Sequence, residues 1–482
     1  MGAHSAPRPE KTSVFARKGP GSPGCSGRGT IPEALASTEC CYNAASAGAR
    51  NRLSCGLGRG SMRRRIRSAC LLAAAGWLLL AGVATAQNGA ILDQQLDASN
   101  RGHTVLRLWG SHYEMGYAQG SLLGDYIVTG VDEIKELAGD QYASLRLLMA
   151  FSVWKPPEIE DELNGMVAAL AESHPLAGID KLDLKVANTH GDYSYACRSH
   201  MSWGRYVAHP IKTLATRRLD FGSPTPTSNH HVLTARDPND GSLRWVNLAW
   251  PGAVAAATGV NEFGTMASLH DYDSEGADLS AGRMPRSVAS RYALTFPTGG
   301  DVSTHLSGVF AELQGYEIMT GGFFNYYAPE GHGGVMTANP YQVGTDFYHL
   351  RVPQGAWHHG EAMITTNRQT DGTTTPGDED FGADDYYDDE SPKTLESHWD
   401  LLASGGGDKL HVMSVAYRGR NDMTIWADGR IDPPHGGRTE RLEWEWSELF
   451  GPAQVPALSG SGLAMMALLL CAVAGAIQKL RG

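Results

Sequence analysis

Cysteine is nearly absent from the central part of this 482-residue chain. Six of the seven cysteines lie towards the two ends, at Cys25, Cys40, Cys41, Cys55, Cys70 and Cys471. Residues 87–455 therefore hold a single cysteine, Cys197, and cannot form an internal disulfide. A lone cysteine is often only a small buried apolar residue, but an odd cysteine in an exported domain indicates a reactive thiol.

Sequence motifs of several large enzyme classes are also missing. The central region contains no H-E-x-x-H pair, no C-x-x-C pair, no G-x-S-x-G on a strand-to-helix turn and no glycine-rich phosphate loop. Their absence argues against a zinc hydrolase, a serine α/β-hydrolase and a nucleotide-binding enzyme. The pairs His230-His231 and His358-His359 do not predict a metal site, because adjacent side chains on a strand point to opposite faces. We expect no cofactor and no metal.

Positive charge is scarce after the first 86 residues. Residues 87–482 carry 28 Lys or Arg against 49 Asp or Glu, a formal net charge of −21. A body this acidic repels phosphate backbones, so we expect no nucleic-acid partner.

The N-terminal region has the layout of an export signal. In residues 62–86 four arginines precede the apolar stretch Ala69 to Val83, which ends in Ala84-Thr85-Ala86. A positive start, a short apolar run and small residues at the end are typical of a secretory signal peptide. Residues 1–61 show no hydrophobic periodicity and are interpreted as a non-structural leader or a misassigned start. We expect the body to be exported, to the periplasm or the cell surface.

The C-terminal region has a linker followed by an apolar segment. Residues 452–461 (PAQVPALSGS) are rich in Pro, Gly and Ser, and residues 462–482 contain an apolar run closed by Lys479 and Arg481. Such a run is marginal for spanning a bilayer, and a basic end favours the cytoplasmic side. This tail is interpreted as a sorting or anchor segment that attaches the body to a membrane.

The body between these ends is expected to be one α+β domain. Helical spacing is seen over Asp132 to Trp154 and Glu158 to His174, interrupted by two prolines. Short β-prone runs separated by turn signals then dominate, with a helical stretch near Ser287 to Leu294 and others later. The runs expected as strands before that stretch are 201–207, 211–219, 231–235, 243–250, 253–260 and 265–269.

Cys197 lies where helical sequence gives way to these strands. A free thiol has a pKa of about 8.5 and needs a base or a cation beside it to react at neutral pH. No histidine is obviously placed for this task. Cleavage of the bond between Ala196 and Cys197 would give the cysteine its own α-amino group, with a pKa near 8, as in enzymes with an N-terminal nucleophile.

Several short motifs, in order from about Thr104 to Trp426, resemble the isopenicillin-N acyltransferase family of cysteine N-terminal-nucleophile (Ntn) hydrolases. The segment from Cys197 to Asp220 also resembles the related bile-salt hydrolases and penicillin V acylases. The matching residues are Gly110-Ser111-x-Tyr113-Glu114-x-Gly116, Gly120, Asn188-Thr189, Cys197 with Ser199, Trp203-Gly204, Arg217-x-Leu219-Asp220-Phe221, Gly259-Val260-Asn261-x-x-Gly264 and Thr366-Asn367.

The resemblance implies a four-layer αββα sandwich and autoproteolysis before Cys197. The chain would split into a helical α piece, residues 87–196, and a β piece, residues 197–451, which stay associated. Cys197 would carry the acyl group as a thioester, Arg217 and Asp220 would orient the thiol and the amine, and Asn367 would donate to the oxyanion.

Two positions depart from the family pattern. Arg198 stands where relatives have Thr or Ser, and Arg368 replaces the usual His. Arg198 and Ser199 are candidate substrate contacts. The function expected is hydrolysis of the amide bond of a small N-acylated substrate, because acyl-CoA is not available outside the cytoplasm. Two alternatives remain open: acyl transfer between small amines, and a non-catalytic relative that binds acyl ligands.

Overall fold

The computed structural model describes residues 88–99, 101–190, 196–220, 229–271, 282–296, 302–338, 348–352, 358–366, 382–403, 409–431, 437–438 and 440–451. The chain divides into two units, residues 1–86 and 87–482, and all the described residues belong to the second. The leader 1–61, the signal peptide 62–86, the linker 452–461, the tail 462–482 and Asn367 lie outside the described residues and stay predictions.

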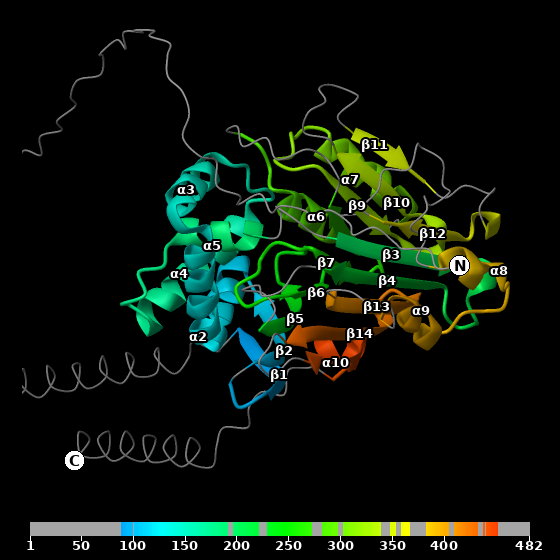
Figure 1. The fold of residues 1–482 in the computed structure, drawn as a ribbon, viewed down its shortest axis with the longest axis horizontal. Helices are drawn as coiled ribbons and strands as arrows, with labels where there is room; N and C mark the ends of the chain where they lie inside the picture. Colours follow the sequence, from blue (N-terminus) through cyan, green and yellow to red (C-terminus); the bar gives the residue numbers. More distant parts are fainter. Residues whose placement is uncertain are drawn as a thin grey trace, which may run out of the picture. The chain divides into compact units, whose positions relative to one another are not determined.

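Helices come mainly in one block before Cys197 and again after the central strands (Figure 1). The α-helices are α2 (His112–Ala138), α3 (Tyr142–Phe151), α4 (Glu158–Ser173), α5 (Lys181–Thr189), α6 (Arg286–Thr295), α7 (Val302–Leu313), α8 (Ala383–Asp388), α9 (Leu395–Ala403) and α10 (Trp446–Phe450). Short 3₁₀ turns are η1 (Gly139–Gln141), η3 (Gly204–Tyr206), η4 (Pro329–Gly331) and η6 (His358–Gly360).

The described strands form two sheets. The first has the order β1 (Gly89–Leu96), β2 (Gly102–Gly110), β5 (His230–Pro238), β6 (Trp245–Ala249), β7 (Thr258–Asn261), β8 (Met266–Asp271), β9 (Gly322–Tyr327), β10 (Gly334–Ala338) and β11 (Tyr348–Arg351). The second has the order β12 (Ala362–Thr365), β3 (Ala196–Trp203), β4 (Thr213–Asp220), β13 (Lys409–Gly419), β14 (Asp422–Ile431) and β15 (Gly437–Arg438), with β16 (Leu442–Glu445) also paired to β14.

The first sheet contains one parallel pair of strands, and the chain between them crosses to the second sheet. Neighbouring strands are antiparallel except β2 and β5, which run parallel. A parallel pair needs a long crossover, and here the crossover contains helices α2 to α5 together with the β3–β4 hairpin of the second sheet. The chain that leads into Cys197 therefore leaves one sheet and enters the other.

Each face of the first sheet packs against a different layer. One face, with Leu106, Val232 and Phe324, shares a core with residues of α2, α4 and α6. The other face, with Val105 and Leu233, shares a core with strands of the second sheet. Helix α9 lies against β4 and β13 of the second sheet (Figure 1). The architecture is thus mixed α/β, with two sheets that face each other and helices that cover them.

Two glycines allow α2 and α4 to cross closely. A Cβ on Gly116 would lie 1.9 Å from the carbonyl oxygen of Glu162, and one on Gly165 would lie 2.0 Å from that of Tyr113. These distances leave no room for a side chain. The Gly116 of the opening sequence motif therefore serves helix packing. The same motif supplies the N-cap of α2, where Ser111 and Glu114 form a capping box.

The sequence predicted most strands and helices near their observed positions, and three expectations were wrong. The strand expected over 201–207 ends at Trp203, and residues 204–206 form η3, which begins at Gly204 with a φ of +57°. The helix expected over Asp132 to Trp154 is interrupted at Gly139, whose φ of +50° ends α2. The strand expected over Ala253 to Val260 begins only at Thr258. The backbone before Thr258 bonds to side chains instead of a strand: Arg236 Nη2 donates to the Ala253 carbonyl, and Arg291 Nη1 donates to the Val254 carbonyl, both at 2.7 Å.

Candidate active site

Cys197 is the second residue of β3, at the point where the chain enters the second sheet. Its side chain is buried, with 3% of its surface exposed, and it forms no disulfide. It packs against Leu219 of β4 and Leu410 of β13. The sequence thus placed this cysteine correctly at the start of a hairpin.

The β3–β4 register places both predicted partners on the strand beside the cysteine, with Arg217 opposite Ser199 and Asp220 opposite Ala196. Cys197 itself lies opposite Leu219. Arg217, two residues before Leu219, shares the Cys197 face of the hairpin. Its Nη2 lies 3.2 Å from the Cys197 Sγ, so a cation touches the thiol directly.

Arg217 is completely buried and held on several sides. Its Nη2 also donates to the Leu269 carbonyl at 2.7 Å, and its Nη1 donates to Thr258 Oγ1 at 2.7 Å and to His411 Nε2 at 3.1 Å. These contacts come from β7, β8 and β13. They leave the guanidinium little freedom to move away from the sulfur.

Asp220 lies on the opposite face of β4. Its Oδ1 accepts from Arg218 Nε at 2.5 Å, and both side chains are largely buried. Because Asp220 pairs with Ala196 along the strands, it ends β4 beside the peptide bond that self-cleavage would break. Arg218 and Asp220 are two residues apart on the strand and therefore share a face, where they form this ion pair.

The environment of the thiol favours its protonated form in the continuous chain. Burial raises the pKa of Cys197 to about 11, and the charges of Asp220 and Asp271 add to this effect. Arg217 and Arg286 act in the opposite direction. A thiol with this pKa is protonated at neutral pH, so it needs a further change to become a nucleophile.

Ser199 belongs to a second group of buried polar side chains beside the cysteine. Its hydroxyl lies 2.8 Å from His270 Nε2 and 2.8 Å from the Tyr327 hydroxyl, which in turn donates to Thr365 Oγ1 at 3.1 Å. The sequence did not single out His270 or Tyr327. Neither belongs to a local motif, and only the pairing of the two sheets brings them to Ser199.

The remaining candidates lie in different surroundings. Ser199 is fully buried, whereas Arg198 is half-buried and lies on the face of β3 away from Cys197. Their substrate-contact role stays a prediction. Thr365, two residues before Asn367, pairs with Ser199 across β12 and β3. The oxyanion role of Asn367 is a prediction about a residue outside the described part.

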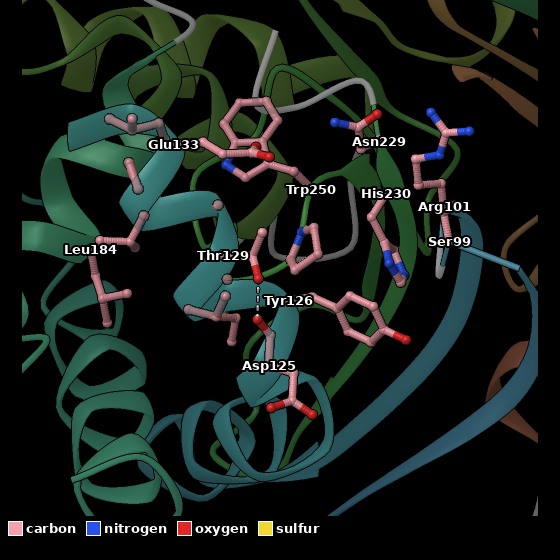
Figure 2. A pocket seen from close by; sticks show the side chains of 17 residues that line it. Ser99, Arg101, Asp125, Tyr126, Thr129, Glu133, Leu184, Asn229, His230 and Trp250 are labelled. Carbon is pink, nitrogen blue, oxygen red and sulfur yellow. Dashed lines mark hydrogen bonds between the residues drawn. The ribbon is translucent and has the colours of Figure 1, made fainter. Parts of the chain in front are cut away.

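A hollow of about 300 Å³ lies elsewhere, between α2, α5 and the start of β5 (Figure 2). Figure 2 shows the rings of Tyr126 and His230 beside each other, with centroids 4.0 Å apart. Trp250 and Leu184 form part of the same lining. The lining includes none of Cys197 and its bonded neighbours, so the hollow and the thiol are separate features.

Neither a metal centre nor a membrane span is found among the described residues. They contain no group of three or more His, Cys, Asp or Glu side chains placed to hold a metal ion. No helix among them combines the length and hydrophobicity needed to cross a bilayer.

The chain was compared with protein-family models, with curated sequences and with solved structures. No protein-family model matches the chain. No curated protein matches it by sequence. Among solved structures it is similar to a Caenorhabditis elegans N-acylethanolamine-hydrolyzing acid amidase ortholog, at 11% identity and a TM-score of 0.34, over 46% of this chain and 92% of that chain.

Proposed function

We propose that this chain is an Ntn hydrolase that cleaves the amide bond of a small N-acylated substrate, with Cys197 as its nucleophile. The observation that carries the proposal is the contact of 3.2 Å between the Arg217 guanidinium and the Cys197 sulfur. A guanidinium at this distance stabilises a thiolate against the proton. A cysteine kept only for packing needs no buried cation at its sulfur.

Self-cleavage supplies the missing base. The Cys197 thiol attacks the Ala196 carbonyl, the Ala196–Cys197 C–N bond breaks as the nitrogen takes the thiol proton, and water hydrolyses the resulting thioester to leave the Ala196 carboxylate. Cys197 then carries a free thiol and an α-amino group whose pKa is near 8, and this amine takes the thiol proton in catalysis. Asp220, opposite Ala196 in the register, lies where a carboxylate can hold the resulting ammonium. The raised pKa of Cys197 in the continuous chain keeps the thiolate fraction small, and in the cleavage step the adjacent Ala196 carbonyl compensates by its proximity.

Catalysis then proceeds in two half-reactions. The thiolate attacks the carbonyl carbon of the substrate, the amide C–N bond breaks, and the ammonium of Cys197 gives its proton to the departing amine. Water next attacks the thioester, gives a proton to the amine of Cys197 and releases the acid. An oxyanion donor such as Asn367 supplies about 3 kcal/mol to steps of this kind.

We propose the four-layer αββα arrangement for the same body. The observed layers support it, because helices cover one face of the first sheet, the other face meets the second sheet, and α9 lies on the far side of the second sheet. Residues 62–86 and 462–482 are proposed as a signal peptide and an anchor. N-terminal sequencing of secreted protein tests the first of these.

The test of the activity uses a panel of fluorogenic N-acyl amides. Wild-type protein is expected to release amine and to form a thioester that hydroxylamine traps as the hydroxamate. Cys197→Ala is expected to do neither while keeping its thermal unfolding midpoint. Release of amine by the Cys197→Ala protein at the wild-type rate would overturn the assignment.

One observation favours a second candidate, a non-catalytic relative that binds acyl ligands. The buried thiol with a pKa near 11 is also what an inert cysteine would show. In that case the wild type binds N-acyl amides without releasing amine. Acyl transfer, the other alternative, is distinguished by adding a second amine and measuring the new amide.

A further inference from the structure

His411 stands at the centre of the contacts that hold Arg217. It is buried in β13, with 1% of its surface exposed, and lies opposite Leu219 of β4. Its Nε2 lies 3.1 Å from Arg217 Nη1 and 2.9 Å from Thr258 Oγ1, and Nη1 donates to the same Oγ1 at 2.7 Å. The three side chains form a closed triangle at Nη1, while the sulfur contacts Nη2.

The hydrogen-bond donors in this triangle determine the protonation state and the tautomer of the His411 imidazole. Arginine nitrogens can only donate hydrogen bonds, so His411 Nε2 must accept from Nη1. An accepting Nε2 carries a lone pair, and the proton of the neutral ring then resides on Nδ1. The Thr258 hydroxyl accepts from Nη1 and donates to Nε2. A protonated His411 would place two donors and two positive charges against each other.

The surroundings of His411 keep its ring in place. The ring of His231 meets it edge-on, with centroids 6.2 Å apart and an angle of 88°. His231 in turn occupies the space above Gly429, where a Cβ would lie 2.1 Å from the His231 ring. Gly429 pairs with His411 along β13 and β14. The fold therefore makes room for a packed pair of histidines behind Arg217.

We propose that His411, as the neutral imidazole, is a positioning residue that holds the Arg217 guanidinium against the Cys197 thiol. The inference deepens the proposed function, because it assigns how the thiolate is stabilised at that site. His411 acts through Arg217, whose Nη1 donates to His411 Nε2 while its Nη2 lies at the sulfur. Its contribution is to accept the Nη1 proton and so direct Nη2 to the sulfur.

The test measures thiolate absorbance at 240 nm as a function of pH in the full chain. Each variant is compared with the same variant carrying Cys197→Ala, so that the difference reports Cys197 alone. His411→Leu is expected to shift the Cys197 titration upward by about one pH unit, a tenfold loss of thiolate. Arg217→Met should do the same, and the double variant should shift it no further.

Rescue and control variants separate positioning from packing. His411→Gln offers an amide oxygen as acceptor and is expected to keep the wild-type titration of Cys197. If His411 acted as a charged group, His411→Gln would shift that titration as His411→Leu does. Ser414→Ala removes the Ser414–Thr216 hydrogen bond of 2.7 Å from the same strand and should leave the titration unchanged. If the His411→Leu protein does not fold, Thr258→Val takes its place. It is expected to shift the Cys197 titration upward as well.

The outcomes distinguish this inference from the proposed function. An upward shift in His411→Leu that is absent in His411→Gln supports the inference, even if mass spectrometry of the same samples shows an uncleaved, inactive chain. A wild-type titration in His411→Leu, or a shift that adds in full to that of Arg217→Met, overturns it, even if the enzyme is active.

Discussion

At the scale of single residues, burial has two effects at the site. It favours the protonated form of the Cys197 thiol, and it strengthens the attraction between the Arg217 guanidinium and a thiolate. Cys197 and Arg217 are both removed from water, and an interaction between charges is stronger where solvent does not screen it. The same burial that raises the pKa of the thiol therefore strengthens its contact with Arg217. Small changes at either residue should have large effects on the thiolate.

Replacing Arg217 tests this contact. Arg217→Lys keeps a positive charge but cannot reach the sulfur, Thr258 and His411 together, because a lysine offers one nitrogen. We expect its rate of thioester formation to fall by about tenfold or more, since one pKa unit of the thiol is a tenfold change in thiolate. Rapid-quench measurement of thioester formation is the readout. A rate equal to that of the wild type would refute a role for the guanidinium.

Replacing Asp220 separates an ion-pair role from an active-site role. Asp220→Asn removes the carboxylate that lies 2.5 Å from Arg218 and opposite Ala196. Breaking a buried pair costs about 3 kcal/mol, so a lower unfolding midpoint is expected. We also expect slower self-cleavage, measured by intact mass in samples of equal folded fraction. Arg218→Met breaks the same ion pair and should cleave faster than Asp220→Asn; equal rates would reduce Asp220 to a structural role.

At the scale of elements, the second sheet carries a buried polar cluster on the face away from Cys197. The rings of His200 on β3 and His398 on α9 stack with centroids 3.8 Å apart. Ser202 and Thr216 contact the two nitrogens of His398 at 3.0 and 3.1 Å. Tyr387 of α8 lies 2.9 Å from His200 Nδ1. These contacts attach α8 and α9 to β3 and β4.

This cluster predicts loss of stability in acid. Burial lowers the pKa of His200 to about 3 and holds that of His398 well below its ordinary value. The unfolded chain takes up protons at these groups below about pH 6.5, while the folded chain does not, so the free energy of unfolding falls as the pH drops from about 6.5 towards 3. Thermal unfolding from pH 7 to 4 measures the slope. His200→Leu should reduce that slope, and an unchanged slope would contradict the account.

Local sequence predicted the residues of the β3–β4 hairpin better than the residues that contact them from other strands. The spacing of Cys197, Arg217 and Asp220 lies within one hairpin, where strand alternation alone decides which side chains meet. His411 and Thr258 reach the same guanidinium from β13 and β7, and no local pattern marks them. The polar strand β1 (GAILDQQL) was not predicted, because its apolar and polar residues do not alternate. Pairing with β2 forms β1. The helix α5 was also missed, although Asp180 and Asp183 form a capping box at its start.

At the scale of the whole body, buried charge ties the helices before Cys197 to β5 and α6 after it. Glu162 of α4 is completely buried, and its two carboxylate oxygens lie 2.5 Å from Arg291 Nη2 and 3.2 Å from Arg236 Nε. His112 Nδ1 lies 3.0 Å from the same carboxylate. Burial alone would raise the pKa of Glu162, but the two guanidinium groups hold it well below its usual range. Proposed self-cleavage would place Glu162 on one piece and both arginines on the other.

Removing this charge should weaken the association of the two pieces. Glu162→Gln leaves two buried guanidinium groups facing a neutral amide, which we expect to cost about 3 to 5 kcal/mol. Urea unfolding measures the loss, and size-exclusion chromatography in intermediate urea shows whether cleaved pieces separate. The matched control is Glu172→Gln at the exposed end of the same helix, where only a hydrogen bond from Tyr117 is lost. Equal midpoints for both variants would contradict the account.

The most direct measurement is the intact mass of the purified protein, combined with N-terminal sequencing. We expect two associated fragments whose masses place the break between Ala196 and Cys197, with cysteine as the first residue of the second fragment. Cys197→Ala should accumulate as an uncleaved chain. Amide hydrolysis by a protein that remains continuous through residue 197 would contradict the central claim.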